Sequence, residues 1–306
     1  MRKYKVAIAG YGIVGKRRHH FIDQHPLLKV VAISDINKEQ VNTVNKDIKV
    51  FLDYNKLLNE EFEILFICLI NNVAATVTIK GLLKGCHVFC EKPPGRNVLE
   101  IENVIETHKK HKNQILKYGF NHRYHDSVVL AKKKIESGEY GEIISLNGIY
   151  GKSRIVDFDG GWRSQKKFSG GGILIDQGIH MLDLILFFAG KFNEVKSFIS
   201  NKFWNFDVED NAYAIMRNKS GVVAMLNSSA TLWEHKFNLK INLTRGVIEL
   251  SGLLTSSKSY GEEKIFSSKH NSEILNNNLE KTEYKFFEDK SWENEIEEFE
   301  GKKQAT

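Results

Sequence analysis

A glycine-rich turn between a buried strand and a helix constrains the fold of this chain most strongly. Lys5–Ala9 is apolar enough to predict a buried strand, and Gly10-Tyr11-Gly12-Ile13-Val14-Gly15 follows it directly. Glycines in this G-x-G-x-x-G spacing allow a tight turn, close approach of the backbone to a pyrophosphate, and close packing of helix on strand. The turn therefore predicts a dinucleotide-binding βαβ unit. Its cofactor contacts are expected to be Gly10, Tyr11, Gly12, Ile13, Val14 and Gly15.

The second expected strand, Leu28–Ser34, ends in a carboxylate. Asp35 comes about 20 residues after the third glycine, where an acidic residue hydrogen-bonds the ribose hydroxyls of a dinucleotide. The alternative is an aspartate that only begins a turn. Because a carboxylate at this position repels a 2′-phosphate, the sequence favours NAD over NADP.

Three cations, Lys16-Arg17-Arg18, follow the glycines in the first turn of the expected helix. The helix dipole disfavours positive charge at this end. A cofactor pyrophosphate nearby would relieve the conflict, and solvated side chains that point away are an equal alternative.

Apolar runs and helical segments alternate as far as residue 120. Ile64–Ile70 is almost continuously apolar, which is typical of a parallel strand covered on both faces. The alternation predicts a doubly wound parallel sheet. Its later elements are expected at residues 74–84 and 98–111, as helices, and at 115–120, as a strand.

Val88–Cys90 is a short apolar strand that leads into Glu91-Lys92-Pro93. Proline fixes φ and has no N–H to donate, so the strand must stop there. Lys92 therefore lies at the carboxyl end of a strand, where open α/β sheets bind their ligands. A lysine in that position can stabilise charge or donate a proton, and the alternative is a surface turn.

Beyond residue 121 the pattern changes to short segments in which apolar and polar residues alternate or β-branched residues follow one another. This texture predicts a mostly antiparallel open sheet in an α+β second domain, so the chain divides into domains 1–121 and 122–306. The expected strands are 143–150, 195–199, 212–216, 222–228 and 239–243.

One apolar helix, Ile173–Ala189, interrupts these strands after a triple glycine. It should be buried, yet it carries Asp176, His180 and Asp183 at a spacing that places them on one helical face. Buried ionisable groups are costly unless they are paired or used. An imidazole one turn from a carboxylate suits general acid–base catalysis, and the alternative is a structural His–Asp pair.

Four motifs in this order resemble the glucose–fructose oxidoreductase / inositol dehydrogenase / MocA (Gfo/Idh/MocA) family. They are the glycine turn, Glu91-Lys92-Pro93, Gly119-Phe120-Asn121-His122-Arg123-Tyr124, and the triple glycine with the helix from Ile173 to Asp183. The resemblance implies an N-terminal Rossmann domain and a C-terminal domain that binds substrate and whose open sheet mediates dimers or tetramers. It also implies a nicotinamide cofactor and a sugar, inositol or nucleotide-sugar substrate.

Site roles follow from the same resemblance. Lys92, Asp176 and His180 match the family's catalytic set. The further cofactor contacts implied are Asn71, Glu91, Trp162 and Arg163. Asn71 is all that this chain keeps of the Thr-Pro-Asn-x-x-His motif that is frequent in the family.

Composition restricts the partners. Of 306 residues, 27% are charged, and the net charge of +6 is dispersed rather than gathered in a basic run, so a small anionic ligand is favoured over nucleic acid. The three cysteines predict reduced thiols and a cytoplasmic location. They do not suit a metal site, the N-terminus does not read as a signal peptide, and no uninterrupted apolar run is long enough to cross a membrane.

Basic and aromatic residues precede the triple glycine. Arginine and lysine suit a diphosphate or uronate, whereas neutral sugars need carboxylates and amides more. This favours a nucleotide sugar used in polysaccharide biosynthesis, and a free-sugar or inositol dehydrogenase is the alternative. The substrate contacts expected are Lys92, Arg123, Lys152, Arg154, Asp176 and His180.

Other classes of function stay open. A non-catalytic NAD-binding regulatory protein would keep the glycines but would not need Lys92, Asp176 and His180 together. A hydrolase that uses NAD transiently, or an isomerising oxidoreductase with tightly held cofactor, would produce no net NADH.

Overall fold

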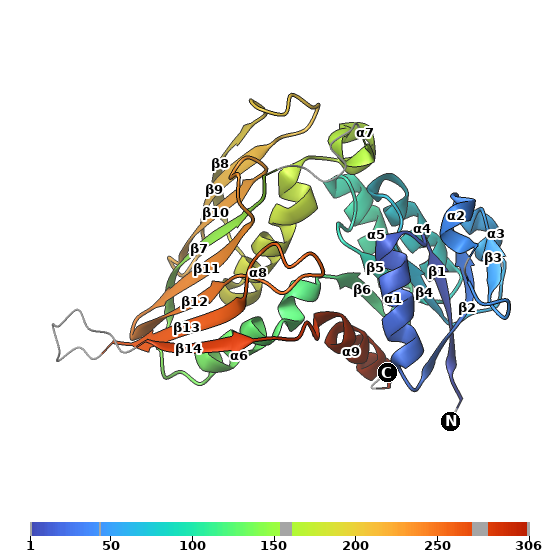
Figure 1. Cartoon of the computed structure of the whole chain (residues 1–306), viewed down its shortest axis with the longest axis horizontal. Helices are drawn as coiled ribbons and strands as arrows, with labels where there is room; N and C mark the ends of the chain where they lie inside the picture. The colour runs from blue at the N-terminus through green and yellow to red at the C-terminus, as the bar shows by residue number, and fades with distance from the viewer. Residues whose placement is uncertain (1, 43, 154–160, 271–280, 305–306) are drawn as a thin grey trace. The chain divides into compact units, whose positions relative to one another are not determined.

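The computed structural model describes residues 2–42, 44–153, 161–270 and 281–304. The chain divides into two compact units, each with its own sheet (Figure 1). The first unit comprises Met1–Phe120 together with Trp292–Thr306, and the second comprises Asn121–Ser291.

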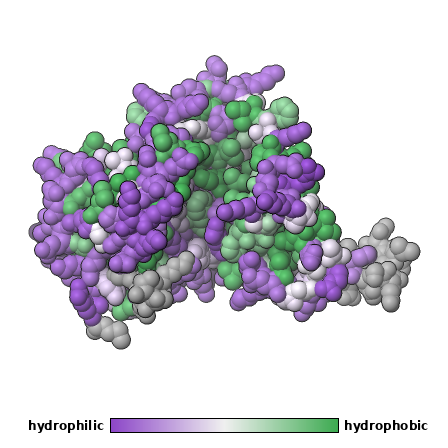
Figure 2. Space-filling model, turned by 180° about the vertical axis from the view of Figure 1, so that it is seen from behind, coloured by the Kyte–Doolittle hydropathy of each residue, from purple (hydrophilic) through white to green (hydrophobic). Residues whose placement is uncertain are grey.

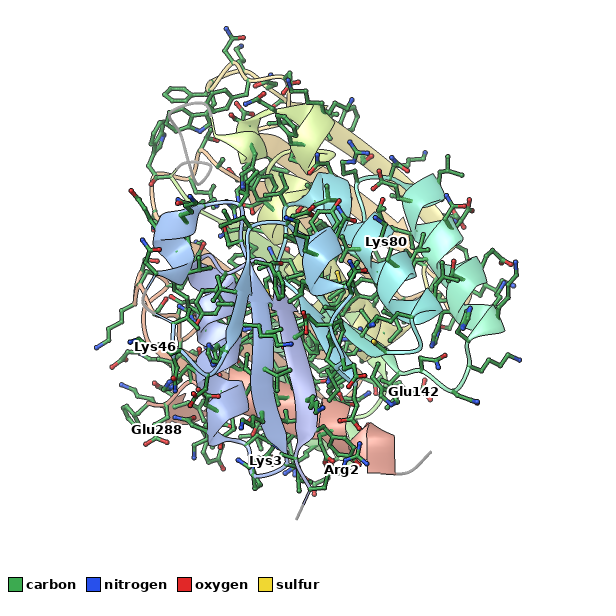
Figure 3. The ribbon with its side chains drawn as sticks, turned by 90° about the vertical axis from the view of Figure 1, so that its right-hand side faces the viewer. Arg2, Lys3, Lys46, Lys80, Glu142 and Glu288 are labelled. Atoms are coloured by element: carbon green, nitrogen blue, oxygen red, sulfur yellow. The ribbon has the colours of Figure 1, made fainter. Side chains whose placement is uncertain are left out.

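The first unit is a parallel six-stranded sheet in the order β3-β2-β1-β4-β5-β6. Arg2 and Lys3 mark the edge of this sheet where β1 begins, so the strands end at the opposite edge (Figure 3). The strands are β1 (Tyr4–Ala9), β2 (Leu28–Ser34), β3 (Lys49–Phe51), β4 (Ile64–Ile67), β5 (His87–Glu91) and β6 (Leu116–Gly119). The helices are α1 (Ile13–Gln24), α2 (Lys38–Val41), α3 (Tyr54–Leu57), α4 (Asn71–Leu83), α5 (Val98–Lys110) and α9 (Ser291–Gln304).

Both faces of this sheet are buried, as the apolar strands predicted. Successive residues of a strand point to opposite faces, so Ala7 and Ala9 pack with α4 while Val6 and Ile8 pack with α1 and α9. The doubly wound parallel sheet expected from the sequence is confirmed.

The last helix, α9, contributes to the core of the first unit rather than the second. Its Ile296 and Phe299 are 1% exposed, and the Phe299 ring meets that of Phe89 edge-on at 5.5 Å. A single boundary after residue 121 assigns this helix to the second domain and is wrong in that respect, because its two apolar side chains complete the layer over β4 and β5.

The second unit is an eight-stranded sheet in the order β14-β13-β12-β11-β7-β10-β9-β8. Only β7 and β10 pair in parallel among the described strands, and this mostly antiparallel sheet confirms the expected α+β fold. The strands are β7 (Ile143–Gly151), β8 (Glu194–Ser200), β9 (Asn211–Arg217), β10 (Val223–Ser229), β11 (Lys236–Leu243), β12 (Gly246–Ser251), β13 (Glu263–Lys269) and β14 (Thr282–Phe286). The helical segments are η1 (Asn121–Tyr124), α6 (Asp126–Glu136), η2 (Trp162–Ser164), α7 (Lys166–Ser169), η3 (Leu174–Gly178) and α8 (Ile179–Ala189).

One face of this sheet packs on α6 and α8, while the other is exposed. Leu146, Leu239 and Ile241 lie in the core with Met181 and Ile185 of α8. The molecular surface carries groups of hydrophobic residues (green) among hydrophilic ones (purple) in Figure 2. The helical run Lys166–Ala189 is long and apolar enough to cross a membrane by composition, but half of its most apolar window is buried in the structure, as expected of a core helix.

The segment expected to be one α-helix begins with a π-helical turn. Leu174–Gly178 (η3) has π geometry, and α8 starts only at Ile179. A π-helix has i→i+5 hydrogen bonds, so the α-helical spacing used to place Asp176 and His180 on one face does not apply across this turn. Such turns are frequent at functional sites.

Candidate functional site

The glycine turn is shaped as a dinucleotide site requires. A Cβ at Gly10, where φ is +90°, would lie 2.4 Å from the Cys68 carbonyl oxygen, and one at Gly15 would lie 2.1 Å from the Gly10 oxygen. At Gly12 a Cβ would meet nothing within 4 Å. Gly10 and Gly15 therefore permit close packing of α1 against β1 and β4, and Gly12 leaves an open surface above the turn.

The residues around this turn fit NAD. Gly12 caps α1 without any side-chain bond, and Ile13 beside it is 81% exposed, so the helix N-terminus presents backbone N–H groups to an anion. Asp35 accepts hydrogen bonds from the backbone N–H groups of Tyr11 at 2.7 Å and of Asn37 at 2.9 Å. Its carboxylate is thereby held next to the turn, where the ribose hydroxyls of a dinucleotide would lie.

The cations after the turn do not share one role. Lys16 donates to Gln40 at 2.9 Å, and the Arg17 guanidinium lies 4.9 Å from the ring of Trp292 on α9. Arg18 is completely buried, which neither of the two sequence interpretations anticipated.

Arg18 joins three elements of the first unit. Its guanidinium donates to Glu91 at the end of β5 at 2.7 Å and to Glu295 of α9 at 2.6 Å. It is stacked on the ring of Phe89 at 4.4 Å and of Trp292 at 4.3 Å. Burial raises the pKa of Glu295 to about 7, a shift that the Arg18 charge opposes and the Glu91 charge increases. Two buried carboxylates thus share one guanidinium.

Asn71, Glu91 and Lys92 lie where β4 and β5 end. Asn71 is buried in the first turn of α4, while Glu91 and Lys92 are half-buried at the end of β5. Because parallel strands end at one edge of a sheet, all three lie at the same edge as the glycine turn. Their contacts to cofactor or substrate stay predictions.

In the second unit, Asp176 is surrounded by cations. Its carboxylate accepts from Lys152 at 2.9 Å and from Arg163 at 3.3 Å. Lys152 is only 2% exposed, and Arg163 lies 4.3 Å from the ring of Trp162. The structure thus brings together four residues predicted to bind cofactor or substrate, and it shows Lys152 and Arg163 engaged with the carboxylate of Asp176.

Another expected substrate contact, Arg123, forms a bidentate pair with Asp183. Its Nε lies 2.7 Å from Oδ2, and its Nη2 lies 2.5 Å from Oδ1. Burial raises the pKa of Asp183, although the hydrogen bonds and charge of Arg123 lower it. Arg154 lies outside the described residues.

His180 lies in a cluster of rings that the sequence did not reveal. It is 6% exposed, and its ring stacks on that of His122 with centroids 3.8 Å apart and planes inclined by 13°. His122 in turn lies 3.0 Å from the hydroxyl of Tyr150. Asn121-His122-Arg123-Tyr124 was noted only as a motif, and nothing in its spacing pointed to contact with His180.

The fold and the site together define an NAD-binding oxidoreductase with two domains. Residues 4–120 match the family described as "Oxidoreductase family, NAD-binding Rossmann fold", and residues 128–249 match "GFO/IDH/MocA C-terminal domain". The chain belongs to the Gfo/Idh/MocA family.

Two similar proteins are named as dehydrogenases of a glucoside and of levoglucosan. D-glucoside 3-dehydrogenase of Escherichia coli is 28% identical over 74% of this chain and 70% of its own length. Levoglucosan dehydrogenase of Pseudarthrobacter phenanthrenivorans is 31% identical over 48% of this chain and 38% of its own length, so this match spans less than half of that relative.

Two solved structures share the fold. A levoglucosan dehydrogenase complex with NADH superimposes with a TM-score of 0.84 at 21% identity, covering 97% of this chain and 89% of that one. The WlbA dehydrogenase of Bordetella pertussis, in complex with NADH and UDP-GlcNAcA, has a TM-score of 0.75 at 20% identity, covering 81% of this chain and 73% of that one.

Proposed function

We propose that this protein is an NAD-dependent dehydrogenase that transfers a hydride to or from a carbinol carbon of a sugar. The observation that carries the proposal is a buried histidine on a helix of the second unit, His180, in a chain whose first unit has an NAD-binding turn. A regulatory NAD-binding protein would not need that histidine, nor Lys92 at the end of β5. The cysteines support a cytoplasmic location as part of this proposal.

The chemistry divides between cofactor and protein. Bound NAD⁺ would supply the acceptor for the hydride of the carbinol carbon. His180 takes the hydroxyl proton as the C–O bond becomes a carbonyl. The role of Lys92 is to stabilise negative charge that develops on the substrate. The residues that would hold NAD are the glycine turn and Asp35.

We further propose that Asp176 orients His180 and tunes its charge. The contacts to Lys152 and Arg163 add a second role. Two cations on one carboxylate hold the start of the π-helical turn in place, which fixes the backbone from which α8 and His180 follow.

Asp35 carries the proposed preference for NAD, and Asp35→Ser is expected to weaken NAD binding by about 10- to 100-fold. Serine loses the charge that strengthens hydrogen bonds to the ribose hydroxyls, and such bonds contribute about 1.5–3 kcal/mol. Isothermal titration of both cofactors into wild type and variant measures this. The exposed Asp47→Ser is the matched control, and a wild type that binds NADP more tightly would refute the ribose assignment.

Two substrate classes fit the second unit. A nucleotide sugar was expected from the basic residues before the triple glycine. However, Lys152 is buried against Asp176 and Arg123 is paired with Asp183, so both cations are already neutralised. This observation favours the alternative, a free sugar or glycoside, whose hydroxyls need hydrogen-bonding groups rather than net positive charge.

A direct competition assay separates these classes. We expect methyl glucosides or inositols to reduce NAD, measured as NADH absorbance, and we expect millimolar UDP to leave that rate within about twofold of its value, because Lys152 and Arg123 each already have a carboxylate partner. The control is ADP-ribose, which is the cofactor without its nicotinamide and should inhibit. Competitive inhibition by UDP, together with turnover of UDP-sugars alone, would restore the nucleotide-sugar assignment.

The exposed face of the eight-stranded sheet is proposed to bind a second copy of the chain. Phe198 of β8 is 81% exposed, and its neighbours across the strands include Tyr213 and Ile215 of β9 and Met225 of β10, which are 47%, 54% and 48% exposed. These exposed apolar side chains fit the homodimer or homotetramer implied by the family, and the mass in solution by light scattering tests this proposal.

A further inference from the structure

The ring of His122 lies face to face with that of His180, and both of its nitrogens have a hydrogen-bond partner. These bonds form a chain within the second unit that starts at a carboxylate. Ser291 donates its hydroxyl hydrogen to Asp289 at 2.6 Å, so the same oxygen must accept from the side-chain amide of Asn121 at 3.1 Å. The amide oxygen of Asn121 is therefore the atom that faces Nδ1 of His122.

The orientation of the Asn121 amide determines the other hydrogen bonds of this chain. Nδ1 of His122 lies 3.1 Å from the oxygen of Asn121 and must carry a hydrogen. In the neutral ring, Nε2 is then bare and accepts from the hydroxyl of Tyr150 at 3.0 Å. Burial raises the pKa of Tyr150, so this hydroxyl keeps its hydrogen. Protonating His122 at Nε2 would require the Tyr150 hydroxyl to turn its hydrogen toward Tyr260, its other hydrogen-bond partner, and would place a positive charge on a ring that is 6% exposed.

The stack between His122 and His180 limits the charge that the two rings can carry together. Two protonated rings at a centroid distance of 3.8 Å would repel each other, whereas a protonated ring and a neutral ring stacked on it attract each other. Burial and the hydrogen bonds to Asn121 and Tyr150 together favour a neutral His122, which leaves His180 as the ring to accept a proton.

We propose that His122 is a positioning residue for His180: it fixes the His180 ring by stacking and stays neutral so that His180 takes the substrate proton. This inference rests on the proposed role of His180 as the base. The titratable groups in ring contact with His122 are His125, which pairs with Glu263, and Tyr150, which lies against Tyr260. Asp176 and Asp183 lie on the same helical segment as His180; Asp176 pairs with Lys152 and Arg163, and Asp183 pairs with Arg123.

The first test needs no substrate. The ¹⁵N-histidine-labelled full chain is titrated from pH 8.5 to 5 and followed by imidazole NMR, with signals assigned through His122→Gln and His180→Gln. We expect His180 to gain the second proton while His122 keeps one protonated and one bare nitrogen. If His122 takes up the proton first, or if both rings protonate together, the proposal is wrong.

The second test uses Tyr150→Phe, which removes the donor to Nε2 and keeps the ring. His122 should then compete for the proton, and the acidic limb of the kcat/KM pH profile should move, whereas a merely structural change would lower activity equally at all pH values. His122→Gln should lower kcat by about 100-fold through loss of ring placement, and His122→Phe, which keeps a stacking face, should recover part of it. The exposed Tyr284→Phe is the control.

The two tests separate the inference from the proposed function. Absence of turnover with every sugar would refute the dehydrogenase assignment, while the NMR titration would still decide whether His122 holds His180 as the proton acceptor. An unmoved pH profile in an active Tyr150→Phe enzyme would refute the inference alone.

Discussion

His180→Ala is expected to lower kcat by about 10²- to 10⁴-fold with little change in NAD affinity, because a positioned acid–base group contributes about that much to rate. Lys92→Ala is expected to give a loss of similar size, since it removes the group that stabilises negative charge on the substrate oxygen. Steady-state kinetics with the best sugar found in the NADH assay measure both, and titration with NAD shows whether cofactor binding persists.

Matched alanine variants distinguish chemistry from folding. His270 and Lys46 are exposed residues of the second and first units, so His270→Ala and Lys46→Ala make the same side-chain deletions without burial. Both should retain wild-type turnover. Near-normal turnover of Lys92→Ala would remove the Glu91-Lys92-Pro93 segment from the mechanism, and a normal His180→Ala enzyme would leave the proton acceptor unassigned.

The sequence predicted the parts of the site that depend on local spacing. The glycine turn, Asp35 and the residue pair at the end of β5 each follow from a strand and the few residues after it, so one segment contains the whole signal. Partners that lie far apart in the chain carried no such signal. His122 and His180 are stacked across 58 positions of sequence, and Asp183 and Arg123 are paired across 60. Charge counting alone therefore assigned Lys152 and Arg123 to the substrate when each has a carboxylate partner.

The sequence predicted the fold to a similar extent. Apolar runs gave the central strands, but the edge strand β3 and the outer strands β12, β13 and β14 were not predicted, since their alternation is mixed with polar residues on the exposed face. The π-helical turn was also missed. Gly178 lies where a Cβ would be 2.5 Å from the hydroxyl of Ser228 on β10, so the turn is shaped by a strand distant in sequence.

Arg18→Met is expected to destabilise the first unit by about 3–5 kcal/mol, the cost of removing one partner from a buried ion pair. The loss should be large because Glu91 and Glu295 would lose the guanidinium that both carboxylates contact, and Glu295 is fully buried. Hydrogen exchange of peptides from β1, β5 and α9, measured by mass spectrometry in increasing urea, reports the free energy of opening of this unit by itself.

Two further variants identify the cause of that loss. Arg2→Met makes the same change in an 81% exposed ion pair with Glu63 and should cost no more than about 1 kcal/mol. Adding Glu295→Gln to Arg18→Met should recover part of the stability, because it removes the uncompensated carboxylate.

In the native chain the pKa of Glu295 is raised to about 7 from 4.5 in the unfolded chain. The contribution of Glu295 to the free energy of unfolding is therefore fully present below pH 4.5 and is lost as the pH rises through 7. The free energy of unfolding of Glu295→Gln should therefore rise relative to that of wild type as the pH increases from 5 to 8. A difference that stays constant across that range would show that Glu295 keeps its charge throughout.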